Sequence, residues 1–323
     1  MIAEKNNTQE KHRRKYTPGL ASLKFKPHYW DPDEARELYN SYFNPSIPQD
    51  TIIYDDCVLG MEKMPSNSVD LVIADPPFGL DFSGKGGTYN RDKDLVVDSY
   101  QEIDFDYNKF TKKWIEQIKR IMKPHATAYV FSGWNHLEDI LFSARVSGLT
   151  TINHLIWKYQ FGVFTKKKYV TSHYHILLFA KDHKTYFFNK MEHYPEDVWD
   201  IKRKYQKGEP KNATTLPFDV IKKCVEFSSR PGDLIFDPFM GMGTSAVVAK
   251  SLWRHYFGFE INEKMQPLVE KRINGIQDGQ EYLPVEKRFE EIYNNARKKY
   301  PLAYKIYSKE LGGIEDAKSK ARS

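Results

Sequence analysis

The sequence has few cysteines and no long apolar run, and each absence excludes a class of protein. Among 323 residues the two cysteines, Cys57 and Cys224, have a spacing that suits neither a disulfide framework nor a zinc site. No apolar stretch approaches the ~18 residues of a membrane-spanning helix, and the first residues lack the apolar core of a secretory signal. The sequence therefore predicts a reduced protein of the cytoplasm, without a metal site.

Two phosphate-binding signatures are missing as well. No Gly-Lys-Ser or Gly-Lys-Thr occurs, which excludes a P-loop, and the glycine-rich turn at residues 238–243 lacks GxGxxG spacing. The charge that is present is mildly basic, with 49 Lys and Arg against 43 Asp and Glu and a net charge of +6. Such a charge permits a polyanionic partner without requiring one. Aromatic residues make up 15% of the chain, which is enough to supply surfaces for base stacking.

A short apolar segment leads into a stiff tetrapeptide. Residues 69–74 predict a buried strand by their apolar, β-branched content, and Asp75, Pro76, Pro77 and Phe78 follow directly. Neither proline can donate to a strand ladder, so a carbonyl here is free to face a ligand. A carboxylate, carbonyl oxygens and a flat ring suit a planar heterocycle with an exocyclic amine. The alternative is that the prolines only end the strand and that Phe78 packs in the core.

A second strand leads into a glycine-rich turn. Residues 234–236 predict a strand that runs into residues 237–244 (DPFMGMGT), and a helix follows at once. Glycines in such a turn let the backbone approach a ligand, with helix N–H groups pointing at it. The next strand, residues 255–259, ends at Glu260, and an acid in this place is the usual partner of a ribose diol. The order favours a nucleoside-containing cofactor over a purely structural turn.

The remaining elements alternate between strands and helices. A strand at residues 51–54, a helical turn and the strand before Asp75 form a β–α–β unit, for which parallel pairing is expected. Further helices are predicted near residues 110–122, 137–144, 220–227 and 282–296, and further strands at residues 126–131, 150–157 and 175–180. The sequence thus indicates an α/β fold.

The two motifs together resemble the amino-methylating DNA methyltransferases that use S-adenosylmethionine, in the circularly permuted group called β. In that group a catalytic Asp-Pro-Pro-Tyr/Phe stretch precedes the cofactor's Phe-x-Gly-x-Gly loop, and residues 75–78 precede residues 237–244 here. The resemblance covers residues 51–274. It implies a Rossmann-like methyltransferase fold with a mixed, mostly parallel sheet and helices on both faces. It also implies S-adenosylmethionine as cofactor and double-stranded DNA as partner.

The resemblance also assigns roles to individual residues. The residues implied for the cofactor site are Asp56, Cys57, Thr214, Asp237, Phe239, Gly241, Gly243, Thr244, Glu260 and Asn262. In this arrangement residues 237–244 surround the methionine part, Glu260 takes the ribose hydroxyls, and Asp56 with Cys57 brackets the adenine ring. The sequence around Thr214 departs from the family pattern His-Pro-Thr-Gln-Lys-Pro, of which it keeps only the Thr and the last Pro.

The implied reaction transfers a methyl group directly to an amine. The target nucleotide leaves the duplex, Phe78 stacks on its base, and Asp75 and the Pro76 carbonyl accept the two amino hydrogens, with Pro77 completing the platform. Catalysis then comes mostly from positioning and acceptor geometry. Asp75 favours adenine-N6, because cytosine-N4 enzymes of this group more often carry Ser there. Cytosine-N4 methylation, RNA methylation and a non-catalytic DNA-binding protein are the alternatives.

Three segments are expected along the chain. They are an N-terminal arm (1–48), a catalytic methyltransferase domain (49–275) and a C-terminal helical extension with a polar tail (276–323). Within the catalytic domain, residues 79–108, 158–172 and 182–212 are candidate DNA-recognition segments, since long polar loops in a compact domain are usually functional or disordered.

Basic residues interleaved with aromatics suit nucleic-acid contact, although a solvated surface explains them nearly as well. The candidates for DNA contact are Lys166, Lys167, Lys168, Lys202, Arg203 and Lys204. A cognate restriction endonuclease as a second partner, and a monomer or a homodimer as the oligomeric state, are compatible with the sequence.

Overall fold

The computed structural model describes residues 18–42, 44–77, 107–159, 166–167, 169–202 and 215–310. The chain divides into a large unit, residues 33–188 and 197–282, and a small unit, residues 1–32, 189–196 and 283–323. Five residues expected in functional sites lie outside the described residues, namely Phe78, Lys168, Arg203, Lys204 and Thr214.

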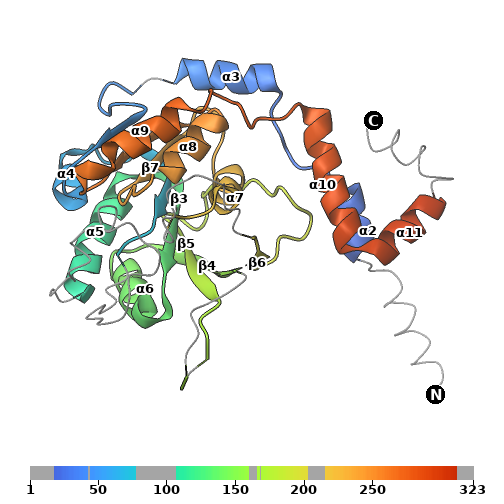
Figure 1. The fold of residues 1–323 in the computed structure, drawn as a ribbon, viewed down its shortest axis with the longest axis horizontal. Helices are drawn as coiled ribbons and strands as arrows, with labels where there is room; N and C mark the ends of the chain where they lie inside the picture. Colours follow the sequence, from blue (N-terminus) through green and yellow to red (C-terminus); the bar gives the residue numbers. More distant parts are fainter. Residues whose placement is uncertain are drawn as a thin grey trace. The chain divides into compact units, whose positions relative to one another are not determined.

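One sheet forms the frame of the large unit (Figure 1). Its described strands have the order β1-β8-β7-β2-β3-β5-β4-β6. Their bounds are β1 Thr51–Ile53, β2 Val69–Ala74, β3 Met122–Ser132, β4 Thr150–Lys158, β5 His173–Ala180, β6 Val198–Asp200, β7 Leu234–Asp237 and β8 His255–Phe259. β5 is antiparallel to both of its neighbours, and every other adjacent pair is parallel. The mixed, mostly parallel sheet confirms the expected fold class.

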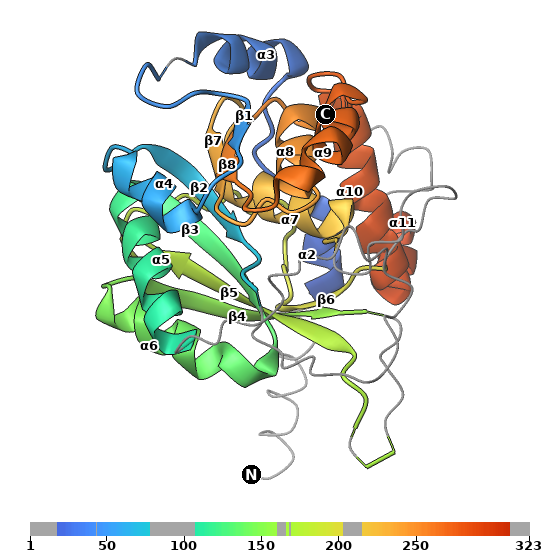
Figure 2. The same cartoon turned by 60° about the vertical axis from the view of Figure 1, so that its left-hand side comes forward.

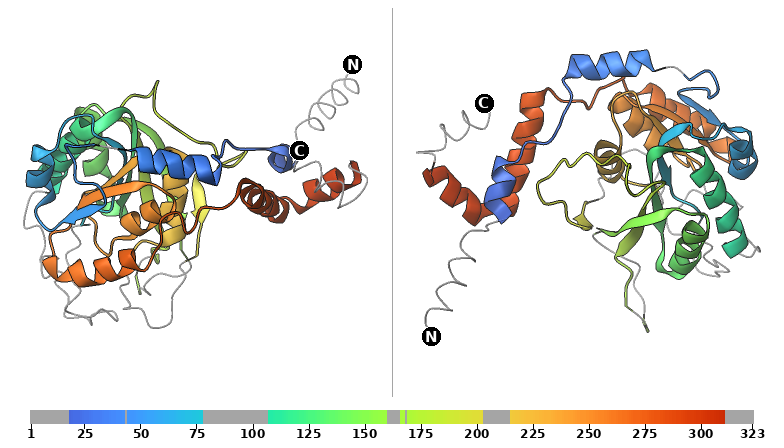
Figure 3. Two further views of the ribbon diagram at one scale, coloured as in Figure 1. Left: turned by 90° about the horizontal axis from the view of Figure 1, so that it is seen from above. Right: turned by 180° about the vertical axis from the view of Figure 1, so that it is seen from behind.

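Helices cover both faces of this sheet (Figures 2 and 3). α4 (Cys57–Lys63), α5 (Tyr107–Ile121) and α6 (Leu137–Val146) pack on one face, where buried residues from these helices and from the central strands form one core. α7 (Phe218–Ser228) lies against β2 and β3 on the other face, followed by α8 (Thr244–Ser251) and α9 (Gln266–Asn274). β2 is buried along its whole length, as expected for a parallel strand that is covered on both faces.

α5 shows how apolar spacing sets a helix and where the sequence misplaces its end. Its residues Thr111, Trp114, Ile115 and Ile118 are buried, at the spacing of three to four residues that one helix face requires. The helix ends at Ile121, and β3 begins at the next residue. The expected helical end at residue 122 is therefore wrong, because that residue already pairs with β2.

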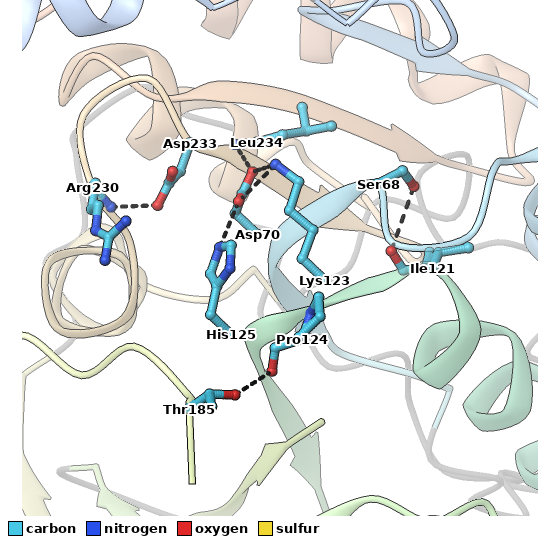
Figure 4. A network of polar contacts seen from close by, with 10 residues as sticks. All are labelled: Ser68, Asp70, Ile121, Lys123, Pro124, His125, Thr185, Arg230, Asp233 and Leu234. Atoms are coloured by element: carbon cyan, nitrogen blue, oxygen red, sulfur yellow. Dashed lines mark hydrogen bonds and ion pairs between the residues drawn. The ribbon is translucent and has the colours of Figure 1, made fainter. Parts of the chain in front are cut away.

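A buried charge network joins three strands at their amino ends (Figure 4). Asp70 of β2 accepts hydrogen bonds from Lys123 Nζ at 2.8 Å and Leu234 N at 3.0 Å, and it lies 3.0 Å from His125 Nε2. Burial alone would raise the pKa of Asp70, but His125 and Lys123 hold it below its ordinary value. Burial and the Asp70 charge raise the pKa of Asp233 to about 6. The network lies opposite the carboxyl ends of the strands, so we assign it a structural role.

The small unit contains three described helices, α2 (Pro18–Lys24), α10 (Val285–Lys299) and α11 (Pro301–Glu310). Leu23 and Ala303 are buried in its small core, against which Tyr293, Tyr300 and Tyr304 pack. The unit carries 18 Lys and Arg against 11 Asp and Glu, whereas the large unit has 31 against 32. The positive net charge of the chain therefore lies in the small unit.

The described part of the first 48 residues, which the sequence predicts to form an arm, contains two helices, α2 and α3 (Pro32–Ser41), and α3 belongs to the large unit from Asp33 onward. Tyr39 of α3 stacks on His255 with ring centroids 4.1 Å apart, and its carbonyl lies 2.9 Å from His255 Nε2. Across the described residues no helix combines the length and the apolar character that crossing a membrane would require.

Candidate active site

Parallel pairing brings four acidic residues to one edge of the sheet. β1, β8, β7 and β2 are consecutive neighbours that run in the same direction. Their carboxyl ends lead to Asp56, Glu260, Asp237 and Asp75, respectively. Residues as far apart in the sequence as Asp56 and Glu260, 204 positions, are thereby gathered along one edge of four adjacent strands.

Asp75 and Asp237 lie at the point where the strand order reverses. β2 is followed by α5 and its neighbour β3, whereas β7 is followed by α8 and its neighbour β8 in the opposite direction. The pairing of Val72 with Phe236 places Asp237 one residue further along this edge and Asp75 three. In open α/β sheets such a switch point leaves a crevice in which ligands bind.

The platform residues follow β2 without interruption. Pro76 is buried, whereas Asp75 and Pro77 are half-buried. Tyr107, the first residue of α5, is 8% exposed and stacks on His136 with ring centroids 3.7 Å apart. Burial, with smaller effects of the Asp139 and Asp75 carboxylates, raises the pKa of the Tyr107 phenol. Tyr107 thus stays neutral and lies close enough to Asp75 to feel its charge. No motif in the sequence predicted that Tyr107 lies near Asp75.

The glycine-rich turn has a backbone that only glycine adopts easily. Gly241 has φ +52° and Gly243 has φ +73°, both in the left-handed region. Gly243 is also the N-cap of α8, which begins at Thr244. A Cβ on Gly243 would lie 2.7 Å from Val269 Cγ1, whereas one on Gly241 would meet nothing closer than the Phe239 carbonyl oxygen at 3.9 Å. The two glycines therefore do different things: Gly243 allows tight packing, and Gly241 leaves open space.

Two buried carboxylates hold this turn in place. Asp237, 5% exposed, accepts hydrogen bonds from Phe239 N at 2.9 Å and from Ser245 Oγ at 2.5 Å. Glu260, 8% exposed, accepts a hydrogen bond from Gly241 N at 2.6 Å. A second bond to Glu260 comes from the backbone of Asn262, at 2.9 Å. Backbone N–H groups that face carboxylates fix the turn before any ligand arrives.

Burial also changes the titration of both acids. It raises the pKa of Asp237 to about 7, against the opposing effect of the Ser245 and Phe239 hydrogen bonds. It raises the pKa of Glu260 as well, despite the backbone N–H groups that the carboxylate accepts. A positively charged ligand beside these carboxylates would favour their ionised forms.

Asp56 and Cys57 begin α4 at the same edge. The Asp56 carboxylate caps the helix by accepting hydrogen bonds from Val58 N at 2.8 Å and Leu59 N at 2.9 Å. Cys57 is 7% exposed, and burial, followed by the Asp56 charge, raises the pKa of its thiol to about 12. A thiol with this pKa stays protonated, so Cys57 is no nucleophile.

Arg272 of α9 is a contact of the turn that the sequence did not reveal. Its Nη1 donates a hydrogen bond to the Met242 carbonyl and lies 3.5 Å from Thr244 Oγ1. The residue stands 28 positions beyond Thr244 and belongs to no motif. Ser245, which donates to Asp237, was missed as well, although it directly follows Thr244.

The described candidates for DNA contact lie near the same edge. Lys166 and Lys167 are exposed between β4 and β5, and exposed Lys202 comes two residues after β6. β4 and β6 run parallel to β3 and β2. The segments that follow β4 and β6 therefore leave the sheet at the same edge as Asp75. Among the described residues, no cluster of three or more His, Cys, Asp or Glu is arranged to hold a metal ion.

The residues at this edge fit a nucleoside cofactor with a cationic centre. Open space above Gly241 leaves room for a ligand against the backbone, and Asp237 supplies a buried carboxyl group that a cationic ligand would ionise. Glu260 uses its oxygens on two N–H groups, but each carboxylate oxygen can accept a further bond from a hydroxyl. Phe239 packs edge-to-face on Trp114 with ring centroids 5.4 Å apart, which ties the turn to the hydrophobic core.

Comparison with known proteins identifies relatives of this arrangement. The family model N6_N4_Mtase, described as DNA methylase, matches residues 69–271, more than half of the chain. The chain is 28% identical over 262 residues to the type II methyltransferase M.HinfI of Haemophilus influenzae, covering 75% of this chain and 71% of that protein. It is 27% identical over 248 residues to M.HpaI of Haemophilus parainfluenzae, covering 71% and 75%.

Solved structures share the fold. The M1.HpyAVI complex with S-adenosylmethionine superposes with a TM-score of 0.55 at 20% identity, covering 69% of this chain and 98% of that one. PvuII DNA methyltransferase, described as cytosine-N4-specific, gives a TM-score of 0.55 at 15% identity, covering 78% and 93%. At these identities the likeness concerns the fold alone.

Proposed function

The chain belongs to the N6_N4_Mtase family of DNA methylases, and from this premise we propose that it methylates the N6 amine of an adenine extruded from duplex DNA. It is an S-adenosylmethionine-dependent DNA methyltransferase. The proposal concerns the base and the residues that act on it. The observation that carries it is the position of Asp75, at the end of β2 and beside the strand that leads into the glycine-rich turn.

The platform would work by accepting hydrogen bonds. Asp75 and the Pro76 carbonyl would accept the two amino hydrogens and so turn the nitrogen lone pair away from the ring and toward the methyl donor. Phe78 would stack on the extruded base. When bound, S-adenosylmethionine supplies an electrophilic methyl group on a sulfonium. As the N–C bond forms and the S–C bond breaks, the surplus proton of the amine would leave through Asp75 or solvent.

The turn would hold the methyl donor in line with that amine. The Asp237 carboxylate would face the cationic amino acid part, Glu260 would accept from the ribose hydroxyls, and the start of α4 at Asp56 would border the adenine ring. Because the carboxylates and Arg272 already fix the turn, little reorganisation is needed on binding. When both reactants are held in the reactive geometry before the chemical step, positioning alone accounts for much of the rate enhancement of a direct methyl transfer.

The base is identified by product analysis. Duplex DNA incubated with the protein and radiolabelled S-adenosylmethionine is digested to nucleosides, and we expect the label in N6-methyldeoxyadenosine. Label in N4-methyldeoxycytidine would overturn the adenine assignment while leaving the acceptor chemistry intact. Transfer to RNA alone would overturn the DNA substrate.

M.HinfI and M.HpaI, the two relatives described above, are type II methyltransferases. We therefore propose a cognate restriction endonuclease as a partner of this protein. The test is whether DNA methylated by the protein is protected from cleavage by that nuclease.

Cofactor affinity should depend on pH near neutrality. Asp237 has a pKa of about 7 without ligand, and a cationic ligand favours its ionised form, so binding should release a proton. The dissociation constant of S-adenosylmethionine should fall as pH rises from about 6 to 8. Calorimetry in buffers of different ionisation enthalpy measures both effects. An affinity that stays constant over this range, with no proton release, would contradict the role of Asp237.

The same pKa has a consequence for stability without ligand. Burial raises the pKa of Asp237 in the folded chain above that of the unfolded chain, so the folded state binds the proton more tightly. The contribution of this group to the free energy of unfolding is therefore present at low pH and is lost as pH rises toward about 7.

Replacing Arg272 by methionine should weaken cofactor binding without changing the chemical step. The variant loses the charged donor to the Met242 carbonyl, and a hydrogen bond to a charged group contributes about 1.5–3 kcal/mol. We expect the dissociation constant of S-adenosylmethionine to rise about 10-fold or more, with an unchanged rate at saturation. Lys271→Met, on the neighbouring exposed residue, is the matched control. Equal affinities of the two variants would show that Arg272 does not position the turn.

A further inference from the structure

A hairpin leaves the sheet at the edge that carries Asp75. β4 and β5 pair up to Lys158 and His173, and Tyr159 N donates to the Ser172 carbonyl at 3.0 Å beyond them. β3 stops earlier, at the pair of Ser132 with His175. The β4–β5 ribbon therefore continues past the end of β3, away from the body of the unit (Figure 2). β3 is the neighbour of both β2 and β5, so the nearer strand of the hairpin, β5, is two strands away from β2 and Asp75.

The neck of the hairpin is braced by aromatic rings. Trp157 is fully buried and stacks on Tyr174 with centroids 5.4 Å apart and planes 20° apart. Tyr159 contacts both rings, at 5.7 Å from Trp157 and 5.5 Å from Tyr174. Trp157 Nε1 also donates to the Ile201 carbonyl at 2.8 Å, which ties the ribbon to the segment after β6. A braced neck can carry a projecting tip at a fixed direction.

The part of the tip that the structure describes presents one aromatic ring and two lysines to solvent. Tyr169 is 99% exposed, the highest value among the large hydrophobic side chains of the described residues, and Val170 beside it is 40% exposed. Lys166 and Lys167 are exposed as well. The large unit as a whole is nearly balanced in charge, so attraction of a polyanion to this edge depends on local clusters of lysine such as this one.

The exposed aromatic ring of the tip suits a duplex from which one base has been extruded. Removing a nucleotide from the stack costs a few kcal/mol, and proteins that distort DNA insert side chains as wedges between base steps. An aromatic ring stacked on a base contributes about 1–3 kcal/mol, whatever the base. Tyr169 precedes His175, the first residue of β5 that pairs with β3, by six residues. An extended segment of this length spans up to about 20 Å.

We propose that Tyr169 enters the duplex at the place vacated by the target base and stacks on the bases left behind, while Lys166 and Lys167 contact the flanking phosphates. The partner is duplex DNA, and the inference rests on the proposed extrusion of the target nucleotide. It adds a residue that acts on the duplex and not on the reacting amine. Tyr169 is thus a positioning residue.

The test measures single-turnover methylation of a duplex that carries the mapped target site. Tyr169→Ala should lower the rate constant on the matched duplex about 5- to 150-fold, the equivalent of one lost stacking contact. On a duplex in which the target base is mismatched and so already easily extruded, the deficit should largely disappear. Tyr169→Phe, which keeps the ring, should behave like the unmodified protein on both duplexes. The affinity for S-adenosylmethionine should be unchanged in all variants.

The lysines are tested by salt dependence. Lys166→Gln with Lys167→Gln should reduce the slope of log Kd for DNA against log salt by about 0.9 for each lost phosphate contact. Lys112→Gln with Lys113→Gln, two adjacent exposed lysines of α5, is the matched control and should leave the slope unchanged. Equal slopes for both pairs would overturn the phosphate contacts.

Equal losses of Tyr169→Ala on matched and mismatched duplexes, or no loss on either, would overturn the wedge. Failure of the proposed function looks different, because the unmodified protein would then fail to methylate adenine in the first place. If the product is methylated cytosine, the comparison of matched and mismatched duplexes is repeated with that base. The wedge is then judged by the rate constant of Tyr169→Ala relative to that of the unmodified protein, on the matched and on the mismatched duplex.

Discussion

Replacing Asp75 by alanine is expected to lower the single-turnover rate constant of methyl transfer by about 1,000-fold, the upper range for the loss of one preorganised polar group at a reacting centre. Asp75 is half-buried at the end of β2, and its carboxylate is proposed to accept a hydrogen from the target amine. Without that acceptor the nitrogen lone pair stays conjugated with the ring. Because the turn at residues 237–244 is held by other residues, the affinity for S-adenosylmethionine should change by less than about 3-fold.

Two comparisons make the result for Asp75 specific. Asp75→Asn keeps the shape and one acceptor oxygen, and it should retain more activity than Asp75→Ala. Asp200→Ala removes an exposed carboxylate at the same edge, but at the end of β6, four strands away from β2, and should transfer methyl groups at the normal rate. Near-normal turnover by Asp75→Ala, with label still found in the same base, would remove Asp75 from the mechanism.

The central strands and their acidic ends were predictable because local sequence determines them. β2 and β8 have the predicted bounds, and β7 extends one residue further than predicted. Each is a short apolar run that stops at an acid, and parallel pairing then brings those stops to one edge. Once two such motifs were found in order, their meeting at a switch point between β2 and β7 followed from the fold class.

β6 was missed for the opposite reason. It has three residues, of which only Trp199 is buried, and it lies in a polar stretch without a clear period. Its pairing with Ile156, Trp157 and Lys158 of β4 is a tertiary contact that three residues cannot encode by pattern. The hydrogen bond between Trp157 Nε1 and the Ile201 carbonyl adds to this pairing.

Contacts that connect distant parts of the chain were equally invisible. Asp70 interrupts an otherwise apolar strand, and only the structure supplies its partners Lys123 and Leu234, 53 and 164 residues away. Arg272 reaches back 30 residues to the Met242 carbonyl. Both contacts satisfy buried polar groups, and the pairing depends on the assembled fold and not on any local propensity.

Gly243→Leu is expected to abolish measurable binding of S-adenosylmethionine, raising its dissociation constant by more than about 100-fold. Gly243 has φ +73°, where a residue with a Cβ loses about 1–2 kcal/mol. The Cβ would also lie 2.7 Å from Val269 Cγ1, so either the turn or α9 must shift. Since Gly243 caps α8, the shift reaches the backbone N–H groups that the proposed cofactor faces. The measurement is calorimetric titration.

A loss of binding must be separated from a loss of folding, and Gly279 offers the matched variant. It also has a left-handed φ, +69°, and a Cβ there would lie 2.0 Å from the Trp253 ring. Gly279→Leu should lower the thermal midpoint about as much as Gly243→Leu, by roughly 5–10 °C, yet it should bind S-adenosylmethionine normally below that midpoint. Normal binding by folded Gly243→Leu would mean that the turn is not the cofactor site. In Gly243→Ala, the added change Val269→Ala removes the clashing methyl group and should recover part of the affinity, because only the backbone strain then remains.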